Sequence, residues 1–211
     1  MMTKKCIAVF GGTFDPIHNA HVEIANDILT EFNLAAVHML PCYIAVHKNV
    51  NATSKQRIKM LRAATTAYNN IKIDLREINR QGKSYMIDTI NEIKAEDQAT
   101  TILLVIGSDS LNNLHTWKNW QQILELTNII VAPRKGTEIK PIDTIAAKTT
   151  IYKEDLVKLK QGAIYILPKK YENISSSSIR EKISTNTNVK DLIEHNVYEI
   201  IKSECLYNSA E

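Results

Sequence analysis

Short apolar runs that alternate with helical segments constrain the fold more than any other feature of this sequence. Each run is rich in Ile, Val or Leu, and the runs are CIAVF (6–10), AVHML (36–40), IKIDL (71–75), TILLVI (101–106), NIIVA (128–132) and AIYIL (163–167). Nearly continuous apolar runs of this length are typical of strands buried on both faces, as in a parallel sheet. We therefore expect six mostly parallel strands.

The segments between the runs carry apolar residues every three or four positions, the spacing of one helix face. The expected faces are Val22/Ala25/Ile28/Leu29/Phe32, Ile58/Leu61/Ala64/Thr65/Tyr68, Met86/Ile87/Ile90/Ile93 and, near the end, Val189/Leu192/Ile193/Val197/Ile200/Ile201. Strand alternating with helix predicts an α/β fold of the Rossmann-like type, a doubly wound sheet with helices on both faces. The segment 134–161, with a glycine, a proline and many lysines, is expected to be irregular.

Composition narrows the class of protein. The 211 residues suit one domain (1–211), and 44% hydrophobic with 23% charged residues are globular values. The net charge of +3 comes without a Lys/Arg stripe, so we expect no nucleic-acid partner. Cys6, Cys42 and Cys205 form no CxxC pair, which favours free thiols and the cytoplasm. No apolar run reaches the ~20 residues of a membrane span. A homo-oligomer is left open.

The glycine turn GGTFDP follows the first expected strand. Ligands of open α/β sheets bind beyond the carboxyl ends of the strands. Gly11 and Gly12 would let backbone N–H groups approach an anion closely there, and the positive end of the next helix would add to the attraction. The turn matches neither GxGxxG nor GxxxxGK[ST], which disfavours a dinucleotide cofactor and a Walker-type loop.

Two histidines follow this turn. Asp15-Pro16 predicts a helix start, with Asp15 as the cap and Pro16 at the first helical position. His18 and His21 would then lie one turn apart on one face, pointing toward the anion. Zinc would need a third ligand, and none stands at a useful spacing. Phosphate contact is therefore the preferred interpretation, and two unrelated surface histidines are the alternative.

A second phosphate motif, ISSSSIREKI (174–183), follows the last expected strand and opens a helix. Serines at a helix start cap free N–H groups, which also bind phosphate well. Ser177 and Arg180 would share one helix face, and the planar fork of arginine suits phosphate. The alternative is a serine-capped surface helix with a solvated arginine.

Both motifs resemble signatures of the nucleotidylyltransferase superfamily. GGTFDPIHNAH is similar to the signature ending in HxGH, with Ala20 in place of glycine, and ISSSSIR is similar to ISSTxIR, with Ser177 in place of threonine. The resemblance implies that His18 and His21 are the catalytic pair, holding ATP phosphates and stabilising charge on the α-phosphate. It also implies an ATP site that includes Gly11, Gly12, Thr13 and Phe14. In that site, Ile174 and Ser175 would lie near the adenine, and Ser177 and Arg180 would hold the β- and γ-phosphates.

The middle of the chain resembles bacterial nicotinate mononucleotide adenylyltransferases. The similar segments are IGSDSLNNLHTW (106–117) to GxDxLxxLxxW, SYMIDTI (84–90) to SYTxxTL, PCYIAVHK (41–48) to PxxxPPHK and VAPRKG (131–136) to VxxRxG. This resemblance adds Gly107 and Asp109 to the ATP site, with Asp109 accepting from sugar hydroxyls. It implies that the pyridine nucleotide binds Lys48, Thr89, Trp117 and Arg134.

The resemblance runs from residue 6 to residue 207 and implies a nucleotidylyltransferase-type fold whose C-terminal helical part, about 172–207, completes the ATP site. The implied reaction joins ATP to nicotinate mononucleotide, giving deamido-NAD and pyrophosphate in NAD biosynthesis. Mg²⁺ is expected on the ATP phosphates, with no metal site built from protein groups. The alternatives are nicotinamide mononucleotide as acceptor, less favourably phosphopantetheine, and a non-catalytic nucleotide-binding module on the same fold.

Overall fold

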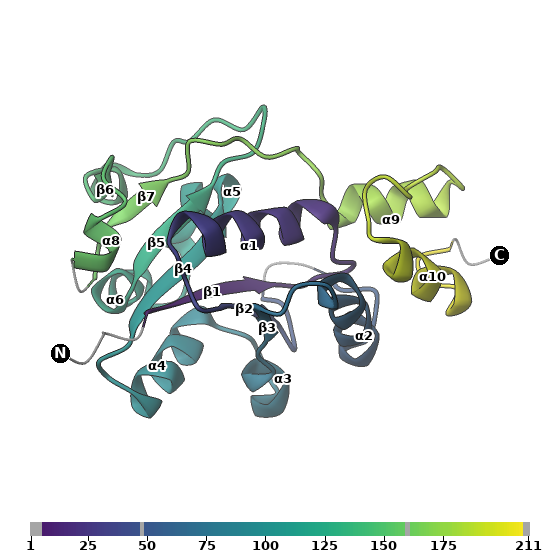
Figure 1. Ribbon diagram of the computed structural model, residues 1–211, viewed down its shortest axis with the longest axis horizontal. Helices are drawn as coiled ribbons and strands as arrows, with labels where there is room; N and C mark the ends of the chain where they lie inside the picture. Colours follow the sequence, from purple (N-terminus) through teal and green to yellow (C-terminus); the bar gives the residue numbers. More distant parts are fainter. Residues whose placement is uncertain (1–5, 47–48, 159–160, 209–211) are drawn as a thin grey trace.

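A parallel sheet of seven strands forms the centre of the computed structural model, which describes residues 6–46, 49–158 and 161–208 (Figure 1). The strand order is β3-β2-β1-β4-β5-β7-β6, and every pairing is parallel. The strands are β1 (Cys6–Gly12), β2 (Val37–Pro41), β3 (Ile71–Ile73), β4 (Thr101–Gly107), β5 (Asn128–Ala132), β6 (Thr149–Thr150) and β7 (Ile164–Ile166). The six expected strands and the doubly wound α/β class are confirmed; β6 was not expected.

Two hydrophobic layers flank the sheet because successive residues of a strand point to opposite faces. Phe10 packs with α1 and α2 on one face, whereas Val9 packs with α4 and α6 on the other. Figure 1 shows α1 and α4 on opposite sides of the sheet. The longer helices are α1 (Asn19–Glu31), α2 (Ser54–Thr65), α4 (Met86–Glu96), α6 (Trp120–Leu126), α9 (Ser176–Ser184) and α10 (His195–Ser203).

The shorter helices lie in the connections, and they are α3 (Arg76–Arg80), α5 (Ser108–Asn112), the 3₁₀ turn η1 (Leu114–Thr116), α7 (Asp143–Ala146) and α8 (Asp155–Lys158). Between residues 134 and 158, α7, β6 and α8 are the only regular elements that the described part of the chain contains. That segment is largely irregular, as expected. Within residues 6–46, 49–158 and 161–208 no helix is both long and apolar enough to cross a bilayer.

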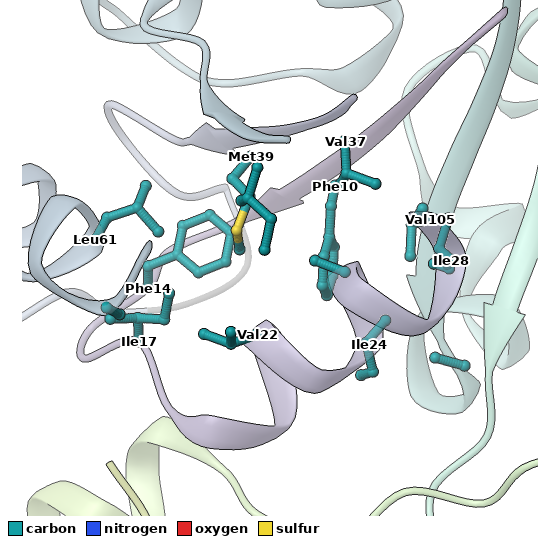
Figure 2. Close-up of a cluster of buried hydrophobic side chains, with 14 of the residues drawn as sticks. Phe10, Phe14, Ile17, Val22, Ile24, Ile28, Val37, Met39, Leu61 and Val105 are labelled. Atoms are coloured by element: carbon teal, nitrogen blue, oxygen red, sulfur yellow. The ribbon is translucent and has the colours of Figure 1, made fainter. Parts of the chain in front are cut away.

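Helix α1 covers the central strands with an apolar stripe. Val22, Ile24 and Ile28 are buried in the same hydrophobic cluster as Phe10 and Met39, and Figure 2 shows Ile28 beside Val105 of β4. Each fully buried aliphatic side chain stabilises the fold by about 1.5–3 kcal/mol relative to exposure. The stripe thereby fixes the helix, and with it the residues at its first turn.

The expected start of α1 is wrong. The helix begins at Asn19, and its N-cap is His18, which has an extended backbone. Asp15 does not cap α1, because its carboxylate accepts hydrogen bonds from the backbone N–H groups of Asn51 and Ala52, at 2.7 and 3.0 Å. Residues 13–18 therefore form a loop between β1 and α1, which we call the β1–α1 loop.

The C-terminal stripe is buried as expected, but only its second half is helical. Val197 and Ile201 lie on α10, whereas Val189 and Ile193 are buried in the turns that precede it. This part of the chain, with α9 and α10, lies beside the N-terminal end of α1 (Figure 1). The backbone N–H of Asn19 donates to the carbonyl of Leu192 at 2.9 Å, which joins the two regions.

Candidate active site

A cavity of about 860 Å³ opens at the carboxyl ends of β1 and β4. Strand order reverses between these two strands, the position at which open α/β sheets bind ligands. Thirteen of the sequence-predicted site residues line the cavity, namely Gly11, Gly12, Thr13, His18, His21, Gly107, Asp109, Trp117, Arg134, Ile174, Ser175, Ser177 and Arg180. Residues from both ends of the sequence therefore meet at one cavity.

Two further predicted site residues, Phe14 and Thr89, do not line it. Phe14 is 1% exposed, and its ring packs edge-on against His21 with the centroids 5.2 Å apart. Thr89 is fully buried, and its hydroxyl donates to Glu77 at 2.6 Å. Lys48 lies outside the described residues. The binding roles of these three residues stay predictions.

The two histidine rings stack on each other, with centroids 3.6 Å apart and planes 23° apart. The backbone N–H of His18 donates to Nδ1 of His21 at 3.3 Å. Because Nδ1 accepts this hydrogen bond, the proton of neutral His21 is assigned to Nε2. His18 is 4% exposed, and His21 is half-buried. The two rings therefore form a stacked imidazole pair at the cavity, in which Nδ1 of His21 is bound to the backbone N–H of His18.

The two glycines at the end of β1 lie against different side chains. A Cβ added at Gly11 would lie 2.7 Å from the end of the Met86 side chain. A Cβ added at Gly12 would lie 3.0 Å from the Phe14 ring, which is part of the core. Gly12 consequently makes room for the ring that packs against His21.

The start of α9 forms the opposite wall. Ser175 is the N-cap and accepts from the backbone N–H of Ser178 at 3.0 Å. Arg180 donates from Nη2 to Oγ of Ser177 at 3.2 Å and from Nη1 to the carbonyl of Asp15 at 2.7 Å. The predicted pair Ser177 and Arg180 thus lies on one helix face, and Arg180 also holds the β1–α1 loop.

Two buried charged residues anchor the β1–α1 loop: Asp15, which lies in the loop, and Arg57, which lies on α2. The sequence did not single out either residue as functional. Asp15 is 0% exposed, and Arg57 is 1% exposed. The Arg57 guanidinium donates to the carbonyls of Thr13 and Cys42, both at 2.7 Å. Buried charges are tolerated where hydrogen bonds satisfy them, so these contacts fix the backbone that leads to the histidines.

One side of the cavity carries aromatic and apolar side chains. Trp117, Tyr85 and Met86 line it, and Nζ of Lys118 lies 4.5 Å from the centre of the Tyr85 ring. Nη1 of Arg134 pairs with Asp109 at 2.9 Å. Asp109, the predicted ribose ligand, therefore stands at the cavity wall with an arginine beside it.

Glu77 and Cys42 also line this side and had no signal in the sequence. Glu77 is 3% exposed, and burial raises the pKa of its carboxyl above the usual range. Burial likewise raises the pKa of the Cys42 thiol. No local pattern distinguishes a buried glutamate from a surface one, so only the fold reveals this group.

Comparison with known proteins agrees with the geometry. Residues 9–182 match the family described as cytidylyltransferase-like. A protein of Legionella pneumophila (strain Lens) named "Probable nicotinate-nucleotide adenylyltransferase" is 35% identical over 95% of this chain and 98% of its own. A protein of Cellvibrio japonicus (strain Ueda107) with the same name is 33% identical over 97% of this chain and 99% of its own.

Solved structures share the fold. The nicotinic acid mononucleotide adenylyltransferase of Plasmodium falciparum complexed with NaAD superposes with a TM-score of 0.76 at 22% identity, covering 96% of this chain and 97% of that one. The same protein complexed with APC gives a TM-score of 0.74 at 21% identity over the same shares. The likeness at this identity concerns the arrangement of the backbone.

Proposed function

This chain belongs to the cytidylyltransferase-like family and, within it, to the nicotinate-nucleotide adenylyltransferases, and we propose that it transfers the adenylyl group of ATP to nicotinate mononucleotide. The products are deamido-NAD and pyrophosphate, a step of NAD biosynthesis. The observation that carries the proposal is the convergence of His18, His21 and Arg180 on one cavity of about 860 Å³. That volume lies in the range that small-molecule sites occupy.

The proposed reaction is a direct displacement. An oxygen of the mononucleotide 5′-phosphate attacks the α-phosphorus of ATP and forms the new P–O bond. The bond from that phosphorus to the α,β-bridging oxygen breaks, and pyrophosphate leaves with the oxygen. No protein group is covalently modified, so catalysis consists of positioning and charge stabilisation.

His21 is the proposed stabiliser of charge on the α-phosphate. Its Nδ1 accepts the backbone N–H of His18, and its Nε2–H is the donor that we propose for the α-phosphate. The ring is held between Phe14 and His18, so the donor is preorganised and needs no rearrangement as charge develops. His18 is proposed to contact the same phosphates.

Arg180, Ser177 and the N-terminus of α9 are the proposed site for the β- and γ-phosphates. A helix start offers backbone N–H groups and a positive dipole to an anion, and Arg180 adds a fixed charge. The backbone at Ile174 and Ser175, on the same wall, is proposed to border the adenine. In this way the C-terminal part of the chain completes the ATP site.

The pyridine nucleotide is proposed to occupy the apolar side, with its ring stacked on Trp117 and its phosphate near Lys48 and Arg134. Thr89, whose hydroxyl donates to Glu77, stays a predicted binding residue for this nucleotide. Mg²⁺ is proposed to arrive as part of the substrate MgATP, because within the described part of the chain no cluster of three or more His, Cys, Asp or Glu side chains could hold a metal.

The test is a steady-state comparison of acceptors, with MgATP saturating and pyrophosphate release as the readout. We expect kcat/KM for nicotinate mononucleotide to exceed that for nicotinamide mononucleotide by about tenfold or more, the scale of one well-placed polar contact. A preference for the nicotinamide form or for phosphopantetheine would refute the proposed acceptor. ATP binding without pyrophosphate release from any acceptor would instead indicate a nucleotide-binding module.

A further inference from the structure

The C-terminal segment (residues 174–208) holds the β1–α1 loop through three hydrogen bonds. Hydrogen bonds between the two run from Ser176 Oγ to the Pro16 carbonyl at 2.8 Å, from Arg180 Nη1 to the Asp15 carbonyl at 2.7 Å, and from the Tyr207 hydroxyl to Asp15 Oδ1 at 2.8 Å. The first two come from α9, at the cavity wall. The third comes from the far end of the described chain, beyond α10.

Asp15 accepts two of these three hydrogen bonds. Its carboxylate is 0% exposed and accepts from the backbone N–H groups of Asn51 and Ala52 as well as from Tyr207. Nη1 of Arg180 lies 3.7 Å from Oδ2 of the same carboxylate. A fully buried carboxylate depends on every donor that it has, because no bulk water can replace one that is lost.

Among the described residues, Tyr207 is the side chain outside the phosphate motifs that donates a hydrogen bond to Asp15. Its ring is half-buried, and its hydroxyl also lies 4.0 Å from Sδ of Met60 on α2. Burial and the nearby Asp15 carboxylate raise the pKa of the phenol. The phenol therefore keeps its proton at neutral pH and remains a donor.

We infer that Tyr207 is a positioning residue for adenylyl transfer, which acts through the carboxylate of Asp15 to fix the β1–α1 loop and the imidazole pair that follows it. The inference rests on the proposed function. Asp15 stands three residues before His18, so a shift of its carboxylate moves the backbone that carries both rings. A displacement of about 1 Å in a catalytic group can cost about a hundredfold in rate.

The experiment replaces Tyr207 with phenylalanine, which removes the hydroxyl and keeps the ring. The matched control is Tyr198→Phe, on the same segment, whose ring packs against the same core beside Lys190. Within the described residues the Tyr198 hydroxyl has no hydrogen bond to the β1–α1 loop. Both full-length variants are assayed well below their unfolding temperatures, so that a loss of folded protein does not enter the rate.

Two readouts are combined. The first is the steady-state rate, for which Tyr207→Phe should lower kcat about tenfold, equivalent to 1.36 kcal/mol, while the KM of each substrate changes much less. The second is the set of imidazole resonances of histidine-labelled protein without substrates, in which the signals of His18 and His21 should move. Tyr198→Phe should alter neither the rate nor these signals.

The inference is overturned if Tyr207→Phe retains the wild-type kcat, if the histidine signals stay in place, or if Tyr198→Phe produces the same changes. Failure of the proposed function is recognised separately. In that case the wild-type protein itself releases no pyrophosphate. The histidine signals then remain as the single readout: if those of His18 and His21 move in Tyr207→Phe, the tyrosine positions the loop, and if they stay in place, it does not.

Discussion

Replacing His21 with asparagine separates the two functions that the structure gives to its ring. Nδ1 accepts the backbone N–H of His18 and closes the start of α1, whereas Nε2 is the proposed donor to the α-phosphate. Asparagine carries Oδ1 at the position of Nδ1 and has no atom at the position of Nε2. The variant His21→Asn should therefore keep the helix start and lose the proposed donor, whereas His21→Ala loses both.

The magnitudes follow from these contacts. Removal of a preorganised donor to developing charge lowers kcat by about 10²-fold or more, and this applies equally to both variants. Loss of the ring contacts with Phe14 and Phe10, at centroid distances of 5.2 and 5.8 Å, reduces the free energy of unfolding by about 1–3 kcal/mol in both. His21→Ala should lose about 1 kcal/mol more, because the backbone N–H of His18 loses its acceptor at the helix start.

The assay measures pyrophosphate release at saturating substrates and urea unfolding of the same preparations. The expected pattern is an equal loss of kcat with an unequal loss of stability. A near-normal kcat for His21→Asn would remove Nε2 from the mechanism. The alternative outcome is that kcat decreases in proportion to the free energy of unfolding, so that His21→Ala is far slower than His21→Asn. That result would show that His21 acts by stabilising the helix start.

The other predictions concern the remaining walls of the cavity. Trp117→Ala should raise the KM of the pyridine nucleotide about tenfold, the worth of one stacked ring, and that of ATP much less; equal effects would assign the tryptophan to packing. Glu77→Gln retains an acceptor for Thr89 but cannot ionise. Burial raises the pKa of Glu77 above 4.5, its value in the unfolded chain, so the wild-type protein loses free energy of unfolding as pH rises above 4.5. Glu77→Gln cannot ionise, so its free energy of unfolding should increase relative to that of wild type over the same pH range. A difference between the two proteins that does not change with pH would contradict this. Gly12→Ala should be less stable than Gly11→Ala by about 1–3 kcal/mol in urea unfolding, because its Cβ meets the buried Phe14 ring, whereas that of Gly11 meets the flexible end of Met86; equal losses would refute the difference.

The strands were predictable because their signal is local. An apolar run buried on both faces of a sheet has the same composition wherever it is placed in the order, so six strands could be identified without the topology. β6 carries no such signal. Thr149 and Thr150 lie at the sheet edge, where pairing with Ile164 and Tyr165 of β7 supplies the strand geometry that their own side chains do not specify.

The candidate site was predictable where residue type and spacing restrict the chemistry. Two histidines after a glycine turn, and serines with an arginine at a helix start, both match the needs of a phosphate, and all of these line the cavity. Thr89 shows the limit of this reasoning. Its position in a motif is visible in the sequence, but its hydroxyl is already committed to Glu77, a contact that depends on how α3 and α4 pack.

The start of α1 shows why local patterns fail at a buried charge. Asp-Pro before a helical segment is typical of a capped start, yet the carboxylate of Asp15 is bound by amides 36 and 37 residues away and by a phenol 192 residues away. A cap contributes about 1 kcal/mol, whereas leaving a buried carboxylate without donors costs more. The long-range partners therefore prevail, and α1 begins at the imidazole pair instead. That outcome places His18 at the cap and its backbone N–H on His21, so the error in the local prediction and the geometry of the candidate catalytic pair have the same physical cause.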